Sequence, residues 1–226
     1  MKEFQKYDII DGEITPSFHK YSAAEQGTGN LITLRFTAVR AGIAFATDKS
    51  PFHLSVVAQH YIDPEIYADT SPAFDLLFEC TDHGLDLESR HNKMADIANL
   101  FKCAFYADLS GTNQDSVESY RHWKSKHGFE HGSLLEAPYA GNIRLGVEAI
   151  KSYVKSHSLD IPKHSPAFEQ LFRITEADLA ERDVMPRYYA VEALRHVMSS
   201  FKRNPGERRI LTPRIPRNTS PLGWMI

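Results

Sequence analysis

The chain has 226 residues, of which 42% are hydrophobic and 24% charged, and its formal net charge is −3 at neutral pH. This composition is typical of a globular protein with a buried core and excludes an intrinsically disordered chain. No apolar run approaches the roughly 20 residues of a membrane-spanning helix. The first residues lack the apolar stretch of a signal peptide, and the two cysteines, Cys80 and Cys103, are too few for a disulfide framework. We therefore expect a cytoplasmic protein that does not enter the membrane.

Charged residues are unevenly distributed. Residues 50–89 contain eight acidic residues and no lysine or arginine, whereas residues 202–226 contain six basic residues and one acidic residue. Opposite charges at the two segments favour an attraction between them, either within one chain or between subunits.

The first third of the chain predicts β-structure. Residues 30–39 alternate between apolar side chains such as Ile32, Leu34 and Phe36 and polar ones. Residues 42–47 and 52–59 continue this pattern, and the short apolar run at 73–80 is consistent with a buried strand.

From Leu87 onward, apolar residues recur at helical spacing. Capping residues and helix breakers predict six helices, which begin near residues 87, 113, 142, 165, 175 and 186. Strands that precede helices, instead of alternating with them, predict an α+β fold: a mostly antiparallel N-terminal sheet packed against a helical C-terminal half.

We expect a single domain over residues 1–203, β-rich at 1–80 and α-rich at 87–203. Residues 204–226 contain four prolines, which lack the amide donor and restrict the preceding residue, so we expect an extended basic arm there. Such an arm is suited to joining the subunits of a homo-oligomer.

Two short motifs repeat the order histidine, any residue, serine. His53 and Ser55 stand in a predicted strand, where alternate side chains share a face, and His131 and Ser133 follow the second predicted helix. The two pairs resemble the 2H phosphoesterase family, although Gly132 replaces an apolar residue of its pattern.

That resemblance implies a hydrolase acting on a phosphodiester or nucleotide. His53 and His131 would transfer protons as general base and acid without a metal cofactor, and Ser55 and Ser133 would bind the phosphate. Arg121 or Lys126 would offset the phosphate charge.

Three alternatives remain open. Asp63, Asp75 and Glu79 resemble the PD-(D/E)xK nucleases, which implies Mg²⁺ at these carboxylates, but Thr81 stands at the lysine position. Cys80 and His83 have the spacing of zinc ligands. The basic arm, with Arg208 and Arg209, is suited to follow a phosphate backbone, which would make the chain a nucleic-acid-binding or partner-binding protein without catalysis.

Overall fold

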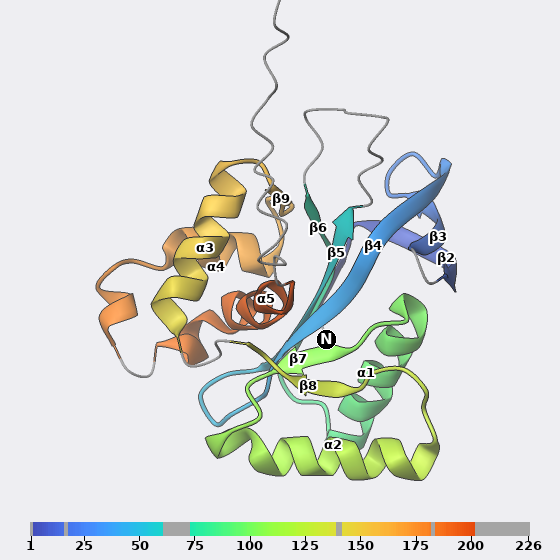
Figure 1. Cartoon of the computed structure of the whole chain (residues 1–226). Helices are drawn as coiled ribbons and strands as arrows, with labels where there is room; N and C mark the ends of the chain where they lie inside the picture. Colours follow the sequence, from blue (N-terminus) through green and yellow to red (C-terminus); the bar gives the residue numbers. More distant parts are fainter. Residues whose placement is uncertain (1, 16–17, 61–72, 139–141, 182–183, 202–226) are drawn as a thin grey trace, which may run out of the picture.

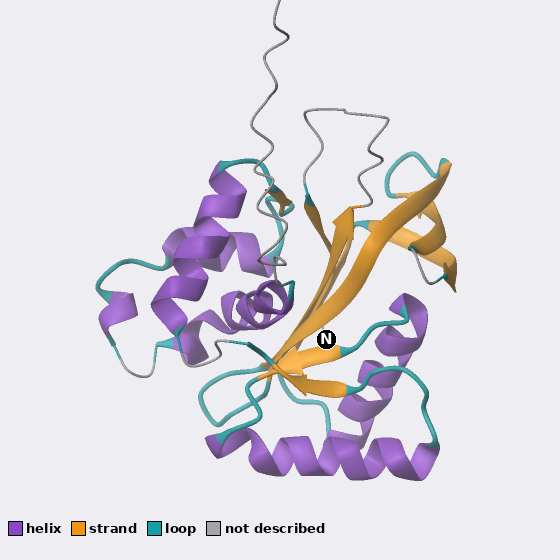
Figure 2. Cartoon of the chain, viewed as in Figure 1, coloured by secondary structure: helices purple, strands orange, loops and turns teal. Residues whose placement is uncertain are grey.

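The computed structural model describes residues 2–15, 18–60, 73–138, 142–181 and 184–201, which form a twisted mixed β-sheet with a layer of helices on each face (Figures 1 and 2). The helices are α1 (Leu87–Phe101), α2 (Gln114–His127), α3 (Ile143–Lys155), α4 (Pro166–Arg173) and α5 (Tyr189–Ser200), joined by the 3-10 turns η1 (Gly111–Asn113), η2 (Asp178–Ala180) and η3 (Met185–Tyr188). No helix in these ranges is long and apolar enough to cross a membrane.

Six antiparallel strands follow the order β1-β6-β5-β4-β3-β2, and three short strands pair in parallel. The strands are β1 (Lys2–Gln5), β2 (Tyr7–Ile14), β3 (His19–Glu25), β4 (Leu31–Ala44), β5 (Phe52–His60), β6 (Phe74–Asp82), β7 (Phe105–Ala107), β8 (Leu134–Glu136) and β9 (Leu159–Asp160).

The long strand β4 is the centre of the sheet. Its first half pairs with β3, and most of its length pairs with β5. Near its end Ala41 and Gly42 pair in parallel with Phe105 and Tyr106 of β7, and β7 then pairs with β8. The carboxyl ends of β4, β7 and β8 therefore lie at one edge of the sheet.

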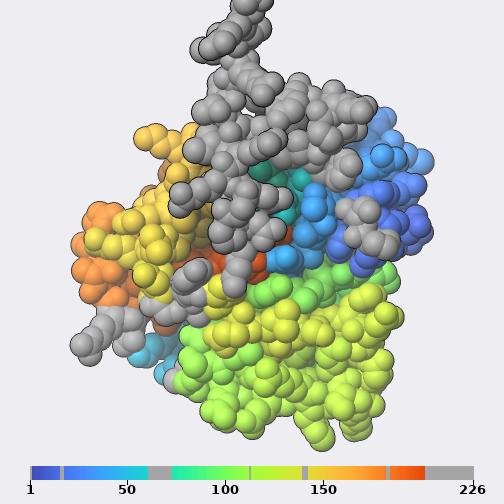
Figure 3. Space-filling view, viewed as in Figure 1, coloured from blue at the N-terminus to red at the C-terminus, as the bar shows by residue number. Residues whose placement is uncertain are grey.

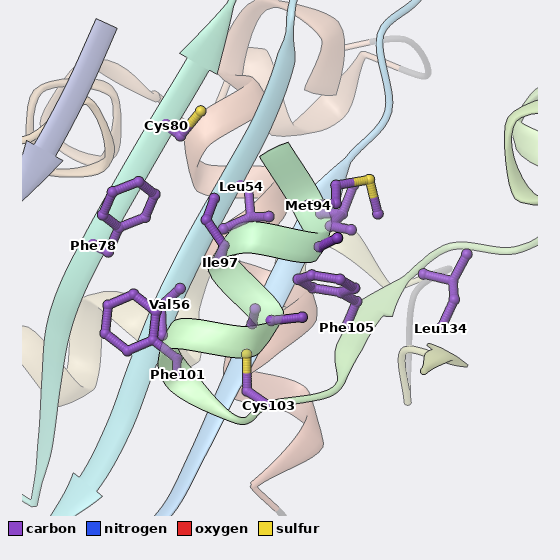
Figure 4. Packing of buried hydrophobic residues seen from close by; sticks show 14 of the residues in the cluster. Leu54, Val56, Phe78, Cys80, Met94, Ile97, Phe101, Cys103, Phe105 and Leu134 are labelled. Carbon is purple, nitrogen blue, oxygen red and sulfur yellow. The ribbon is translucent and has the colours of Figure 1, made fainter. Parts of the chain in front are cut away.

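The first hydrophobic cluster, here called the α1 cluster, lies between the sheet and helices α1 and α2. Leu54 and Val56 of β5 contact Met94, Ile97 and neighbouring side chains of α1, while β7 and β8 close the far side (Figure 4). All of these side chains are buried, and each contributes roughly 1.5–3 kcal/mol by leaving water.

The second cluster, here called the α5 cluster, lies on the opposite face beneath α3, α4 and α5. Val57 and Leu76 of the sheet pack against Val191, Leu194 and Val197 of α5. In Figure 3 the region of α2 is coloured green to yellow at the bottom of the view, and α3 and α4 are coloured yellow to orange at the left.

The α+β class is confirmed, and so are most of the expected helix ends. Asn142 caps α3 through the amide of Leu145, Ser165 caps α4 through that of Phe168, and Gly128 ends α2 in a left-handed conformation. The segment near 175 forms only a 3-10 turn.

The sequence pattern did not predict the parallel pairings. The order of strands and helices argued against a parallel sheet, yet β7 and β8 are joined by α2 and pair in parallel. Strands of two or three residues are too short to show the alternation that identifies longer strands.

Candidate functional site

A pocket of about 150 Å³ opens at the carboxyl ends of β4 and β7, beside the start of α5. It is lined by residues 44, 45, 47 and 50 at and after the end of β4, by Asn113 before α2, and by side chains of η3 and α5. We call it the β4–α5 pocket. Ala44 ends β4 and Asn113 follows β7, and these two strands pair in parallel.

The acidic side chain of this pocket is Glu192, which is held by two basic groups on the next turn of α5. Arg195 Nη2 lies 2.7 Å and His196 Nε2 lies 3.1 Å from Glu192 Oε1, and Arg195 Nε lies 3.1 Å from Oε2. Burial alone would raise the pKa of Glu192, but His196 and Arg195 lower it to about 2. The carboxylate is therefore ionised at neutral pH and fully engaged.

Neutral hydrogen-bonding groups complete the lining. The hydroxyls of Thr47 and Ser50 lie 2.9 Å apart. Burial raises the pKa of Tyr189, so its phenol keeps its proton at neutral pH. His196 Nδ1 lies 2.7 Å from the carbonyl oxygen of Ile43, which fixes the orientation of the ring.

Behind Tyr189 lies a fully buried polar network on the sheet. His53 Nδ1 lies 2.8 Å from Thr81 Oγ1, and its Nε2 lies 3.2 Å from Ser55 Oγ and 3.1 Å from Glu79 Oε1. The amide of Ala167, at the start of α4, donates to the same Glu79 oxygen. The ring of His53, which is 0% exposed, contacts the ring of Tyr189 at 5.5 Å between centroids.

His53 and Ser55 do lie side by side, as expected, but α5 covers their face of the sheet. His131 and Ser133 lie between α2 and β8, where the Phe105 amide donates to the Ser133 carbonyl. Strands β4 and β7 separate β5 from β8, so three spacings of about 4.8 Å each stand between them. The structure does not bring the two histidines together, and the histidine pair is not confirmed.

The other predicted residues are also dispersed. Arg121 and Lys126 are exposed on α2, which lies on the face of the sheet opposite to His53. Asp63, Arg208 and Arg209 lie outside the described residues, as does the whole basic arm.

Asp75 and Glu79 cannot share one metal ion, because a β-bulge in β6 places them on opposite faces. The register passes from Val56–Phe78 to Val57–Leu76, so Leu77 is the extra residue. Leu76 belongs to the α5 cluster, whereas Leu77 belongs to the α1 cluster. Glu79 contacts His53, whereas Asp75 forms an ion pair with Lys6 at 2.9 Å.

Among the described residues no group of three or more histidine, cysteine, aspartate or glutamate side chains is placed to hold a metal ion. Within the pocket, Glu192 already shares both oxygens with Arg195 and His196. The described lining of the pocket therefore does not fit a divalent cation.

The pocket residues were missed because they are far apart in sequence. One signal was present in the last helix: Glu192 is followed by Arg195 and His196 at the three- and four-residue spacings that bring side chains together on a helix. From the sequence we identified only the buried apolar face of this helix.

The sequence matches no protein-family model and no curated protein. Among solved structures, the large terminase nuclease of the thermophilic phage G20c is similar to the chain with a TM-score of 0.51 and 10% identity, covering 86% of this chain and 94% of that chain. The same nuclease with bound magnesium gives a TM-score of 0.46 at 10% identity, covering 82% and 90%. The nuclease domain of the large terminase from bacteriophage SPP1 with bound manganese gives 0.45 at 15% identity, covering 73% and 87%.

The expectation of a protein without a cofactor is contradicted by the G20c nuclease, whose fold is similar at a TM-score of 0.51 and which was also solved with bound magnesium. At 10% identity, the similarity shows a shared fold.

Proposed function

We propose that this chain is a nuclease-type domain that acts on nucleic acid, and that the β4–α5 pocket contacts the phosphodiester backbone. The observation that carries the proposal is the similarity of nearly the whole fold to a phage terminase nuclease, with a TM-score of 0.51 over 94% of that chain. Because fold alone does not determine function, the place and chemistry of the pocket carry the rest.

The pocket offers several hydrogen-bond donors suited to phosphate oxygens. The pocket is lined by Thr47, Ser50, Asn113 and Tyr189. Neutral polar side chains of these types commonly contact the nucleic-acid backbone. His196 also lines the pocket.

A nucleic-acid-binding domain without catalysis is the second candidate. It is favoured by the state of Glu192, whose two oxygens are engaged by Arg195 and His196.

One experiment tests both candidates. The purified chain is incubated with end-labelled single-stranded and double-stranded DNA and RNA in Mg²⁺, in Mn²⁺ and in EDTA, and cleavage and binding are measured together. We expect both binding and cleavage, and the comparison of the three buffers shows whether cleavage needs a divalent ion. Binding without cleavage in any buffer would favour the second candidate, and the absence of both would reject the proposal.

Two conservative variants locate the activity. Tyr189→Phe removes the hydroxyl of one lining residue, and Asn113→Ala removes the side-chain amide of another. Each is expected to reduce binding or cleavage by roughly 5- to 20-fold, the value of one or two lost hydrogen bonds. Tyr153→Phe on α3 is the matched control, since Tyr153 packs against Phe74 away from the pocket. Equal losses in all three variants would argue against the pocket.

A further inference from the structure

A second groove, of about 480 Å³, lies between α3 and the end of α4, on the helical layer that covers the α5 cluster. We call it the α3–α4 groove. It is lined by Lys151, Val154, Lys155, His157, Leu171 and Phe172. A volume of this size is typical of small-molecule and nucleotide sites.

Phe172 gives the groove an aromatic surface that the fold does not use. On α4, Ala167 and Leu171 are buried in the α5 cluster, whereas Phe172 is 67% exposed. Its ring lies 4.6 Å from that of Phe168, which supports it from one side. An exposed phenylalanine held in this way offers a flat apolar surface to a ligand.

The charges around the groove are of one sign. Lys151, Lys155 and His157 line it, and among the residues that the structure describes no acidic side chain does. The ammonium of Lys151 donates to the carbonyl of Ile174 at 2.9 Å, so this charge is held at the groove, while Lys155 stands in the last turn of α3. A ligand that fits this lining has a flat apolar part and a negative charge.

We infer that the α3–α4 groove binds a nucleotide unit of a single-stranded nucleic acid, with a base stacked on Phe172 and a phosphate beside Lys155. This inference rests on the proposed function, and it adds a second contact site and a preference for unpaired strands. Proteins that bind single strands combine aromatic side chains, on which bases stack, with a positively charged groove that follows the backbone.

The test measures the affinity of the full chain for a fluorescent single-stranded oligonucleotide at several salt concentrations in EDTA, which prevents metal-dependent cleavage. Loss of one stacked base weakens binding by roughly 5- to 150-fold, and we expect Phe172→Ala to fall in this range. Lys155→Ala is expected to reduce the slope of log affinity against log salt by about one, the value of a single phosphate contact.

Matched controls lie on the sheet. Leu31→Ala removes another exposed apolar side chain, 78% exposed at the start of β4, and Lys20→Ala removes a lysine of β3; both should bind as the original chain does. Circular dichroism confirms that each variant is folded.

The outcomes separate the two proposals. If the original chain binds no nucleic acid, the proposed function fails. If it binds, and Phe172→Ala and Lys155→Ala bind equally well, this inference alone is overturned. Equal weakening by the control substitutions would also overturn it. The same holds if the original chain binds a duplex of the same length as tightly as the single strand, and Phe172→Ala weakens both to the same extent.

Discussion

At Glu192, burial and charge act in opposite directions on one carboxyl group. Burial favours the neutral acid, but His196 and Arg195 lower the pKa from 4.5 to about 2. Because the pKa is lower in the folded chain, the carboxylate contributes stability above pH 4.5, and this contribution is lost as the pH falls toward 2. The pKa difference between 4.5 and about 2 corresponds to roughly 3 kcal/mol of folding free energy.

We expect Glu192→Gln to lower the free energy of unfolding by about 2–4 kcal/mol at pH 7, because the buried side chains of Arg195 and His196 then lose the carboxylate that they share. At pH 3 the difference from the original chain should be clearly smaller. Urea denaturation at both values measures it, with Glu148→Gln on the exposed side of α3 as the control. A difference that does not change between pH 7 and pH 3 would contradict this account.

His53 and Glu79 form a second coupled pair, this time away from solvent. A hydrogen bond between His53 Nε2 and Glu79 Oε1 requires one proton between them, so replacing either residue leaves the other without its partner. We expect His53→Gln and Glu79→Gln each to cost about 2–4 kcal/mol, and the double variant to cost at least 1 kcal/mol less than their sum. A double-mutant cycle by urea denaturation measures this coupling, and strict additivity would show that the two side chains act independently.

At the scale of elements, the contact between α5 and β4 depends on the absence of one side chain. A Cβ atom at Gly42 would lie 1.9 Å from the carbonyl oxygen of Ala193 and 2.8 Å from the amide nitrogen of Val197, both backbone atoms of α5. Such atoms cannot yield as a flexible side chain does, so α5 would have to move away from the sheet.

Gly42→Ala is therefore expected to destabilise the chain by about 3 kcal/mol or more, at the upper end of the cost of overpacking. Gly84→Ala is the control, because no atom lies within 4 Å of the added Cβ. Thermal unfolding followed by circular dichroism compares them; a Gly42→Ala chain as stable as the control would mean that α5 is not held so closely.

At the scale of elements, local sequence patterns predict some strands and helices and miss others. The alternation in residues 31–39 and 52–59 and the caps at Asn142 and Ser165 depend on neighbours along the chain, and they predicted the long strands and most helices. The bulge at Leu77 and the strands β7 to β9 depend on partners far away in sequence, and no local pattern indicated them.

At the scale of the whole molecule, the candidate site also depends on contacts between residues far apart in sequence. The β4–α5 pocket joins Ala44, Asn113 and Glu192, which only the pairing of β4 with β7 and the packing of α5 bring together. The histidine pattern indicated catalysis, but the strongest of those signals, His53, is a buried partner of Glu79. A polar residue on the second face of a strand indicates an open site only if no later helix covers that face.

The position of α5 has a consequence for synthesis of the chain. The face of β5 and β6 that carries His53, Ser55 and Glu79 is closed only by helices that follow it in sequence, and α5 is made more than a hundred residues after β5. At about 5–20 residues per second, a ribosome needs several seconds to cover that distance. A sheet that formed during that interval would expose an apolar surface around a polar centre, which makes a partly folded chain prone to aggregate.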